Sequence, residues 1–203
     1  MSKLSTTLAM LGAVSALGVA ALPLSSYAAG SSASKNAQVK VAVDGAISID
    51  ITNPGTASNG EGVTLTGAEL NLGTIKINGA VASGSMGVQV ATNNATGYTL
   101  QIKAASSTDM VGSGNAEGSV IPANKDVAAG KAGWAFKGGK IGNNTAITTS
   151  GQTLAQTETA PTGTEVGGKK TEVTDVTFTV AADSTTAEGT YTGTVVFMAT
   201  AND

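Results

Sequence analysis

Apolar and polar positions alternate most clearly near the end of the chain, in residues 173–202. The runs VTDVTFTVA and TYTGTVVFMATAN are separated there by ADSTTAEG, whose Asp, Ser and Gly are typical turn residues. A period of two with β-branched and aromatic residues indicates half-buried strands. We therefore predict two adjacent strands at the centre of a sheet, with these inward-facing residues: Val176, Phe178, Val180, Tyr191, Val195 and Phe197.

Shorter alternating runs recur upstream and indicate an all-β chain. We predict further strands at residues 39–51 (two strands around a turn), 70–77, 85–92, 97–104, 119–121 and 133–137. The strands 85–92 and 97–104 are expected to pair with each other across an NNAT turn. Residues 106–130 and 138–170 contain few large apolar residues and are expected to be long loops. Short strands separated by Gly, Asn and Thr turns favour a single antiparallel β-sandwich of the Ig-like, Greek-key type.

The start of the chain has the layout of a secretory signal peptide. Lys3 precedes the apolar run LAMLGAVSALGVAALPL, and the small residues of SYA fit cleavage after Ala28. The alternative is an uncleaved membrane anchor, but the run is slightly short for a span and Pro23 interrupts it. We predict three segments: a signal peptide at 1–28, a flexible leader at 29–38 and the β-sandwich domain at 39–203.

Composition excludes several kinds of chemistry. The 203 residues include no Cys and no His, so thiol nucleophiles, His-based triads and Cys/His zinc sites are absent. All the basic residues are Lys and the net charge is -3, which argues against nucleic-acid binding. Paired-carboxylate glycosidase chemistry needs an aromatic-lined cleft, and aromatic residues are only 3%. We expect no enzyme, no cofactor and no metal.

Calcium is the alternative to a metal-free chain, because carboxylates supply the oxygen ligands that calcium prefers. The candidate ligands are Asp44, Asp50, Asp109, Asp126, Asp175 and Asp183. They do not form the Asp-x-Asp-x-Asp-Gly pattern of a calcium loop. Solvated turn residues are therefore the favoured interpretation of these side chains.

Two short motifs suggest a family resemblance. GYTL at residues 97–100 opens one predicted strand, and GTYT at 189–192 leads to FMA at 197–199 in the last strand. In this arrangement residues 85–202 resemble the WxL-domain family of Gram-positive surface proteins, which carry two Trp-x-Leu motifs on strands. Tyr and Phe stand at the two Trp positions here, and Ala stands at the second Leu position. The resemblance implies a secreted β-rich domain that binds cell-wall peptidoglycan non-covalently.

These observations predict a secreted, non-catalytic bacterial cell-surface protein. It would associate with wall peptidoglycan or with other surface proteins, including copies of itself, and would have no membrane contact after signal removal. One alternative is a fibre or pilus subunit built by strand exchange through the leader and residues 39–51; another is an adhesin for glycan or a host ligand that uses the long loops. The predicted wall or partner contacts are Tyr98, Leu100, Trp134, Tyr191 and Phe197, although Trp134 also fits a core position.

Overall fold

The computed structural model describes residues 32–36, 47–52, 57–58, 64–66 and 68–203. The predicted signal peptide, its cleavage site at Ala28 and the predicted strand at 39–43 lie outside the described residues. Within them the chain is all-β, with antiparallel pairing between its strands and one 3-10 turn, η1 (Gly114–Ala116). None of the described residues forms a helix that is long and apolar enough to cross a membrane.

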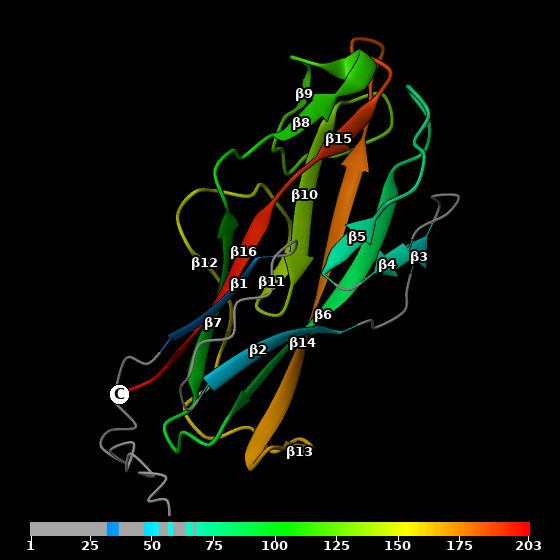
Figure 1. Ribbon diagram of the computed structural model, residues 1–203. Helices are drawn as coiled ribbons and strands as arrows, with labels where there is room; N and C mark the ends of the chain where they lie inside the picture. Colours follow the sequence, from blue (N-terminus) through cyan, green and yellow to red (C-terminus); the bar gives the residue numbers. More distant parts are fainter. Residues whose placement is uncertain (1–31, 37–46, 53–56, 59–63, 67) are drawn as a thin grey trace, which may run out of the picture.

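Two large sheets account for most of the structure (Figure 1). The four-stranded sheet has the order β1 (Ser32–Asn36), β16 (Val195–Ala201), β7 (Tyr98–Ala104) and β12 (Gln152–Gln156). The seven-stranded sheet has the order β11 (Ile141–Thr145), β10 (Gly133–Gly138), β14 (Lys169–Ala181), β6 (Ala82–Thr92) and β2 (Ile47–Thr52). In that sheet β13 (Glu165–Val166) also pairs with β14, and β3 (Ala57–Ser58) with β6.

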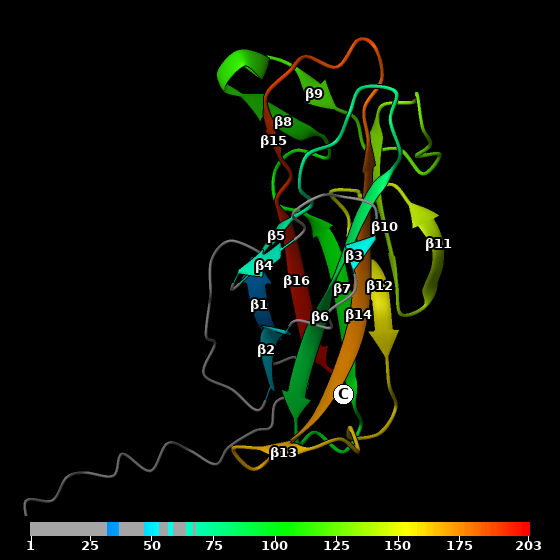
Figure 2. The same ribbon diagram turned by 90° about the vertical axis from the view of Figure 1, so that its right-hand side faces the viewer.

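Two small sheets lie beyond the large ones. β15 (Thr190–Thr192), β8 (Met110–Ser113) and β9 (Val120–Ile121) form a three-stranded sheet, and β4 (Thr64–Thr66) pairs with β5 (Glu69–Asn71). Figures 1 and 2 both show β15 continuing the line of β16 toward the upper end of the molecule, with β2 near the lower end. The upper and lower ends named below refer to these views.

The hydrophobic core lies between the two large sheets. Every second residue of β7 and of β16 is buried, among them Leu100 and Phe197, and β6 and β14 bury Val88 and Val176 in the same cluster. Each large apolar side chain that is fully buried contributes about 1.5–3 kcal/mol of transfer free energy. The alternating pattern in the sequence therefore predicted correctly which faces of these strands are buried.

The predicted pairing of the strongest strands is wrong. β14 and β16 are not neighbours, because β14 lies between β10 and β6, whereas β16 lies between β1 and β7. β6 and β7 likewise belong to different sheets instead of pairing across the NNAT turn. In both cases the connection crosses from one sheet to the other, so the two alternating strands face each other across the core.

Four segments differ from the sequence prediction. Residues 138–170, expected to be a loop, contain β11 and β12, and Ile147 and Leu154 are buried there. Residues 106–130 contain β8, which was not expected, and β9, which agrees with the short strand predicted at 119–121. The expected strand at 70–77 is limited to β5, which ends at Asn71. Residues assigned to the flexible leader form β1, which pairs with β16 from Ser32↔Thr200 to Asn36↔Val196.

Candidate functional site

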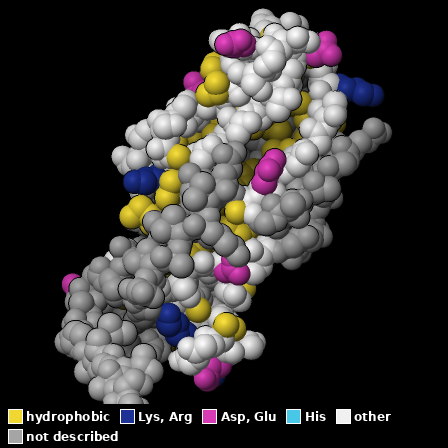
Figure 3. Space-filling model, viewed as in Figure 1, with side chains coloured by type: hydrophobic (Ala, Val, Ile, Leu, Met, Phe, Trp, Pro, Cys, Tyr) yellow, Lys and Arg dark blue, Asp and Glu magenta, His cyan; other side chains and the backbone are white. Residues whose placement is uncertain are grey.

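A groove with a volume of about 910 Å³ opens at the upper end of the core. One wall is the segment 68–77, the other wall is the segment 186–193, and the floor is the upper part of the seven-stranded sheet. We call it the apolar groove. Figure 3 shows hydrophobic side chains gathered in a hollow along this face. The floor and inner wall are formed by Met86, Met110, Ile121, Trp134, Phe178, Val180 and Val195.

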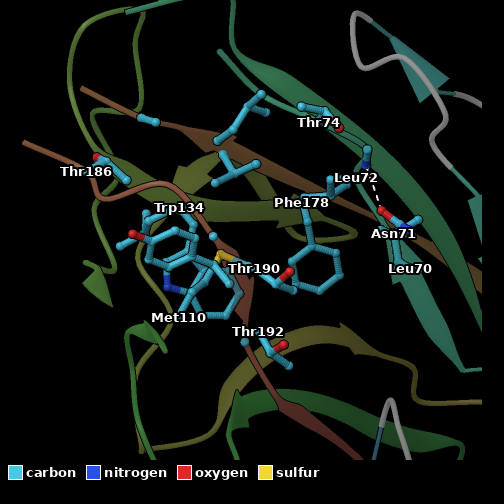
Figure 4. Close-up of a pocket in the computed structure, with 18 of the residues that line it drawn as sticks. Leu70, Asn71, Leu72, Thr74, Met110, Trp134, Phe178, Thr186, Thr190 and Thr192 are labelled. Atoms are coloured by element: carbon cyan, nitrogen blue, oxygen red, sulfur yellow. Dashed lines mark hydrogen bonds between the residues drawn. The ribbon is translucent and has the colours of Figure 1, made fainter. Parts of the chain in front are cut away.

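Two stacked aromatic rings form the floor of the apolar groove. Trp134 of β10 and Phe178 of β14 have ring centroids 6.3 Å apart and an interplanar angle of 20°. Phe136 supports Phe178 with a centroid distance of 6.5 Å. The indole N–H of Trp134 donates to the Thr108 carbonyl oxygen at 2.9 Å, so the polar atom of this ring has a partner. The rings therefore present apolar surface to the groove, as Figure 4 shows.

The wall at 68–77 carries partly buried apolar side chains. Leu70, Leu72 and Ile75 pack against the core, and Ile77 is half exposed. The Asn71 side-chain oxygen accepts the backbone N–H of Gly73 at 2.8 Å, a local turn that ends β5 (Figure 4). Because this turn replaces the expected strand, the segment stands beside the floor as a separate wall.

Local hydrogen bonds shape the opposite wall. The Tyr191 hydroxyl donates to the Ala187 carbonyl oxygen at 2.7 Å. The Asp183 carboxylate accepts from the Thr185 hydroxyl at 2.7 Å and from its backbone N–H at 2.9 Å, and these bonds lower the pKa of Asp183 to about 2. Gly193 is needed at the floor, because a Cβ there would lie 3.0 Å from the Trp134 ring.

The rim of the groove is acidic. Among the residues that line it, the titratable side chains are Glu69, Glu188 and Tyr191, and no Lys lines it. Both glutamates are exposed. The arrangement suits an occupant with an apolar face and basic flanking groups. In the part of the chain that the structure describes, no group of three or more acidic residues could hold a metal ion; Asp109, for example, accepts the backbone N–H of Ala123 at 3.0 Å.

The structure separates the five predicted contact residues into two groups. Tyr98, Leu100 and Phe197 are completely buried, so in this fold they are core residues that no wall polymer can touch. Trp134 and Tyr191 meet at the apolar groove. Trp134 is both a core residue, with 4% exposure, and part of the groove floor. Sequence reasoning missed the groove role of three parts of this site. Alternation predicted only burial for Phe178, Met110 fell in an expected loop, and residues 70–77 were expected to form a strand.

The hydroxyl of Tyr98 is a buried polar group for which the described residues provide no hydrogen-bond partner. Burial, and to a smaller extent the charge of Glu172, raises the pKa of this phenol above its ordinary value near 10. A raised pKa means that the fold favours the neutral phenol. The stability from this group is thus fully present below pH 10 and is lost as the pH rises above it.

We expect Tyr98→Phe to increase the free energy of unfolding by about 1 kcal/mol, because removing an unsatisfied buried hydroxyl removes its desolvation penalty. The variant should also lose less stability than the wild type between pH 9 and about pH 11. Urea unfolding at several pH values measures both effects. Tyr191→Phe is the control and should lose about 0.5–1.5 kcal/mol, because its hydroxyl is hydrogen-bonded. Equal losses in the two variants would contradict the account of Tyr98.

No protein-family model matches the chain, and no curated protein or solved structure matches it. The likeness to WxL domains therefore stays a prediction from the sequence.

Proposed function

We propose that this chain is an exported, non-catalytic cell-surface protein that associates non-covalently with the cell wall or with other surface proteins. The proposal includes an Ig-like β-sandwich formed by the two large sheets and removal of residues 1–28 as a signal peptide. The observation that carries it is the apolar groove, which has a volume of about 910 Å³ and the stacked rings of Trp134 and Phe178 at its floor. Exposed apolar hollows with a polar rim are typical of interaction sites.

A charge placed in the groove should abolish the association. We expect Leu72→Asp to reduce retention on cell walls at least tenfold, because the partner would have to bury a carboxylate against the aromatic floor. The measurement is co-sedimentation of the purified exported protein with cell walls, before and after their non-covalently held proteins are extracted. Loss of retention on extraction identifies a protein partner, and its persistence identifies the wall polymer.

Val166→Asp is the matched control, because it introduces the same charge at a side chain that is 55% exposed and lies outside the groove. It should leave retention unchanged. Equal retention of Leu72→Asp and wild type would exclude the groove as the contact. Failure of the wild-type protein to sediment with either preparation would refute the proposed function itself.

A second candidate function is a subunit of an extracellular fibre that assembles by strand exchange. The observation that favours it is β1, an N-terminal strand at the edge of the four-stranded sheet. A terminal strand that pairs along a sheet edge can be exchanged between copies of a chain, because the same backbone hydrogen bonds form within or between molecules.

A further inference from the structure

The register of β1 leads toward the apolar groove. β1 runs antiparallel to β16, with Ser32 opposite Thr200 and Asn36 opposite Val196. A strand that continued in the same register would place residues 39–43 beside residues 193–189, which line the groove. Directly opposite residues of an antiparallel pair share a face. Because β16 turns Val195 and Phe197 into the core, the alternate residues Val39, Val41 and Val43 would face the groove.

The groove also offers a backbone edge to such a strand. β15 pairs with β8 on one side, and among the described strands it has no neighbour on the other. An edge of this kind has backbone N–H and C=O groups available to an added strand. Gly193, opposite position 39 in this register, carries no side chain and lies close against the Trp134 ring, where a Cβ would be 3.0 Å from it.

Val39, Val41 and Val43 of the same copy cannot all reach the apolar groove while β2 keeps its place beside β6. β2 holds Ile47 opposite Thr92, at the lower end of β6, whereas Phe178 in the groove floor lies opposite Gly84. The eight positions from Gly84 to Thr92 span about 26 Å at 3.3 Å per residue. The four peptide units from Val43 to Ile47 extend at most about 14 Å. Val43 of the same copy therefore falls short of the groove floor.

We propose that the apolar groove binds residues 32–43 of a second copy, added as one continuous strand along the edge of β16 and β15. This strand replaces the β1 of the receiving copy and fills the groove with three valines. The groove is lined by β15, which lies at the upper end, and the start of β2 lies at the lower end (Figures 1 and 2). Donor and acceptor surfaces are thus different, so the contact does not close on itself and copies join head to tail into an open filament.

Charge complementarity supports this occupant. Residues 32–43, SASKNAQVKVAV, contain Lys35 and Lys40 and no acidic residue. The residues that line the groove include Glu69 and Glu188, whereas Lys76 of the wall segment 68–77 is exposed and is not among them. Opposite charges at the rim favour encounter of donor and acceptor and make the association weaken with salt. The inference rests on the second candidate function, the fibre subunit, and names the donor and the acceptor.

Disulfide trapping tests the register and the origin of the strand. The chain has no Cys, so introduced pairs can be read without background. Lys40→Cys and Thr192→Cys are made in separate preparations of the exported protein; position 40 lies opposite 192, and Thr192 is exposed. Opposite Cα atoms in an antiparallel pair are 4.5–5.5 Å apart, which fits a disulfide. Mixing the two preparations under mild oxidation should give a covalent heterodimer, whose 40–192 link mass spectrometry identifies.

Thr190→Cys is the register control, because it lies two positions from the residue opposite Lys40 and is equally exposed. Mixed with Lys40→Cys, it should give at least tenfold less heterodimer. Equal yields for the two mixtures would overturn the register. A chain that carries both Lys40→Cys and Thr192→Cys should form a ladder of linked copies on a non-reducing gel. Its recovery as an internally linked monomer would show that the chain fills its own groove and would overturn the proposal.

A pair of charge variants tests assembly without cysteines. We expect Val41→Asp to keep the protein monomeric in light scattering, because residue 41 would face the apolar groove. Ala42→Asp, one residue later, would face away and should assemble like the wild type. Assembly of both variants, or a wild-type protein that is monomeric at all concentrations, would contradict strand donation. Wall retention of such a monomer would leave the main proposed function standing, so the two failures are distinguishable.

Discussion

Phe197→Ala is expected to lower the free energy of unfolding by about 3–5 kcal/mol. Its side chain is completely buried, and β16 places it opposite Ile102 of β7 in the middle of the four-stranded sheet. Truncation to Ala removes the ring and leaves a cavity that the flanking strands can close only in part. Urea or guanidinium unfolding, followed by the fluorescence of the single Trp, measures the loss.

Met198→Ala is the matched control for this prediction. Met198 is the next residue of the same strand, lies on the opposite face and is only partly buried. Its truncation should cost about 1 kcal/mol. A wall-contact role for Phe197, which the resemblance to WxL domains implies, predicts the reverse: reduced wall retention with nearly unchanged stability. If the two variants lost free energy of unfolding within about 1 kcal/mol of each other, burial of Phe197 would not be a main source of stability.

The sequence predicted burial far better than it predicted pairing. Alternation in β14 and β16 correctly placed Val176, Phe178, Val195 and Phe197 inside. It could not say whether two inward-facing strands are neighbours in one sheet or lie opposite each other across the core, because both arrangements bury the same residues. The turn residues between β14 and β16 predict a hairpin, whereas the connection crosses to the other sheet.

Strands with few apolar residues also could not be predicted from the alternation of apolar and polar positions. β11 has the sequence IGNNT, and its residues are exposed or only partly buried. It therefore shows no alternation of apolar and polar residues that would predict a strand. Backbone pairing with β10 forms the strand instead. β1 similarly lacks large apolar residues and is defined by its pairing with β16. Such strands depend on a neighbour's edge, which no local pattern reveals.

The apolar groove could be predicted only in fragments. Residue type alone points to Trp134 and Tyr191 as contact residues, and the structure brings both to the groove. The groove itself arises because β15 has a neighbour on one side only among the described strands, and because the segment 68–77 stops forming a strand at Asn71. Both causes are topological. The sequence pattern predicts that residues 189–193 begin the final strand. That the edge of β15 has no neighbour among the described strands follows only from the sheet order.

Gly97→Ala is the second substitution with a large expected effect, about 3–4 kcal/mol of lost stability. Gly97 has a φ of +82°, a left-handed conformation that costs an L-residue about 1–2 kcal/mol. A Cβ there would lie 2.5 Å from both the carbonyl oxygen and the hydroxyl oxygen of Thr157. Thr157 exchanges two hydrogen bonds with Tyr98: its N–H donates to the Tyr98 carbonyl at 2.9 Å, and its hydroxyl accepts the Tyr98 N–H at 3.1 Å. Moving Thr157 away strains both bonds.

Gly167→Ala separates the two contributions. Gly167 has a φ of +58°, but a Cβ there would have nothing within 4 Å, so only the conformational cost of about 1–2 kcal/mol applies. The difference between the two variants in denaturant unfolding measures the contact with Thr157. Equal losses would show that the chain can move away from this contact without cost. A larger loss at Gly97 would mean that the glycine of the WxL-like GYTL motif is required by backbone packing, which any β-sandwich with this turn would share, and so does not by itself indicate wall binding.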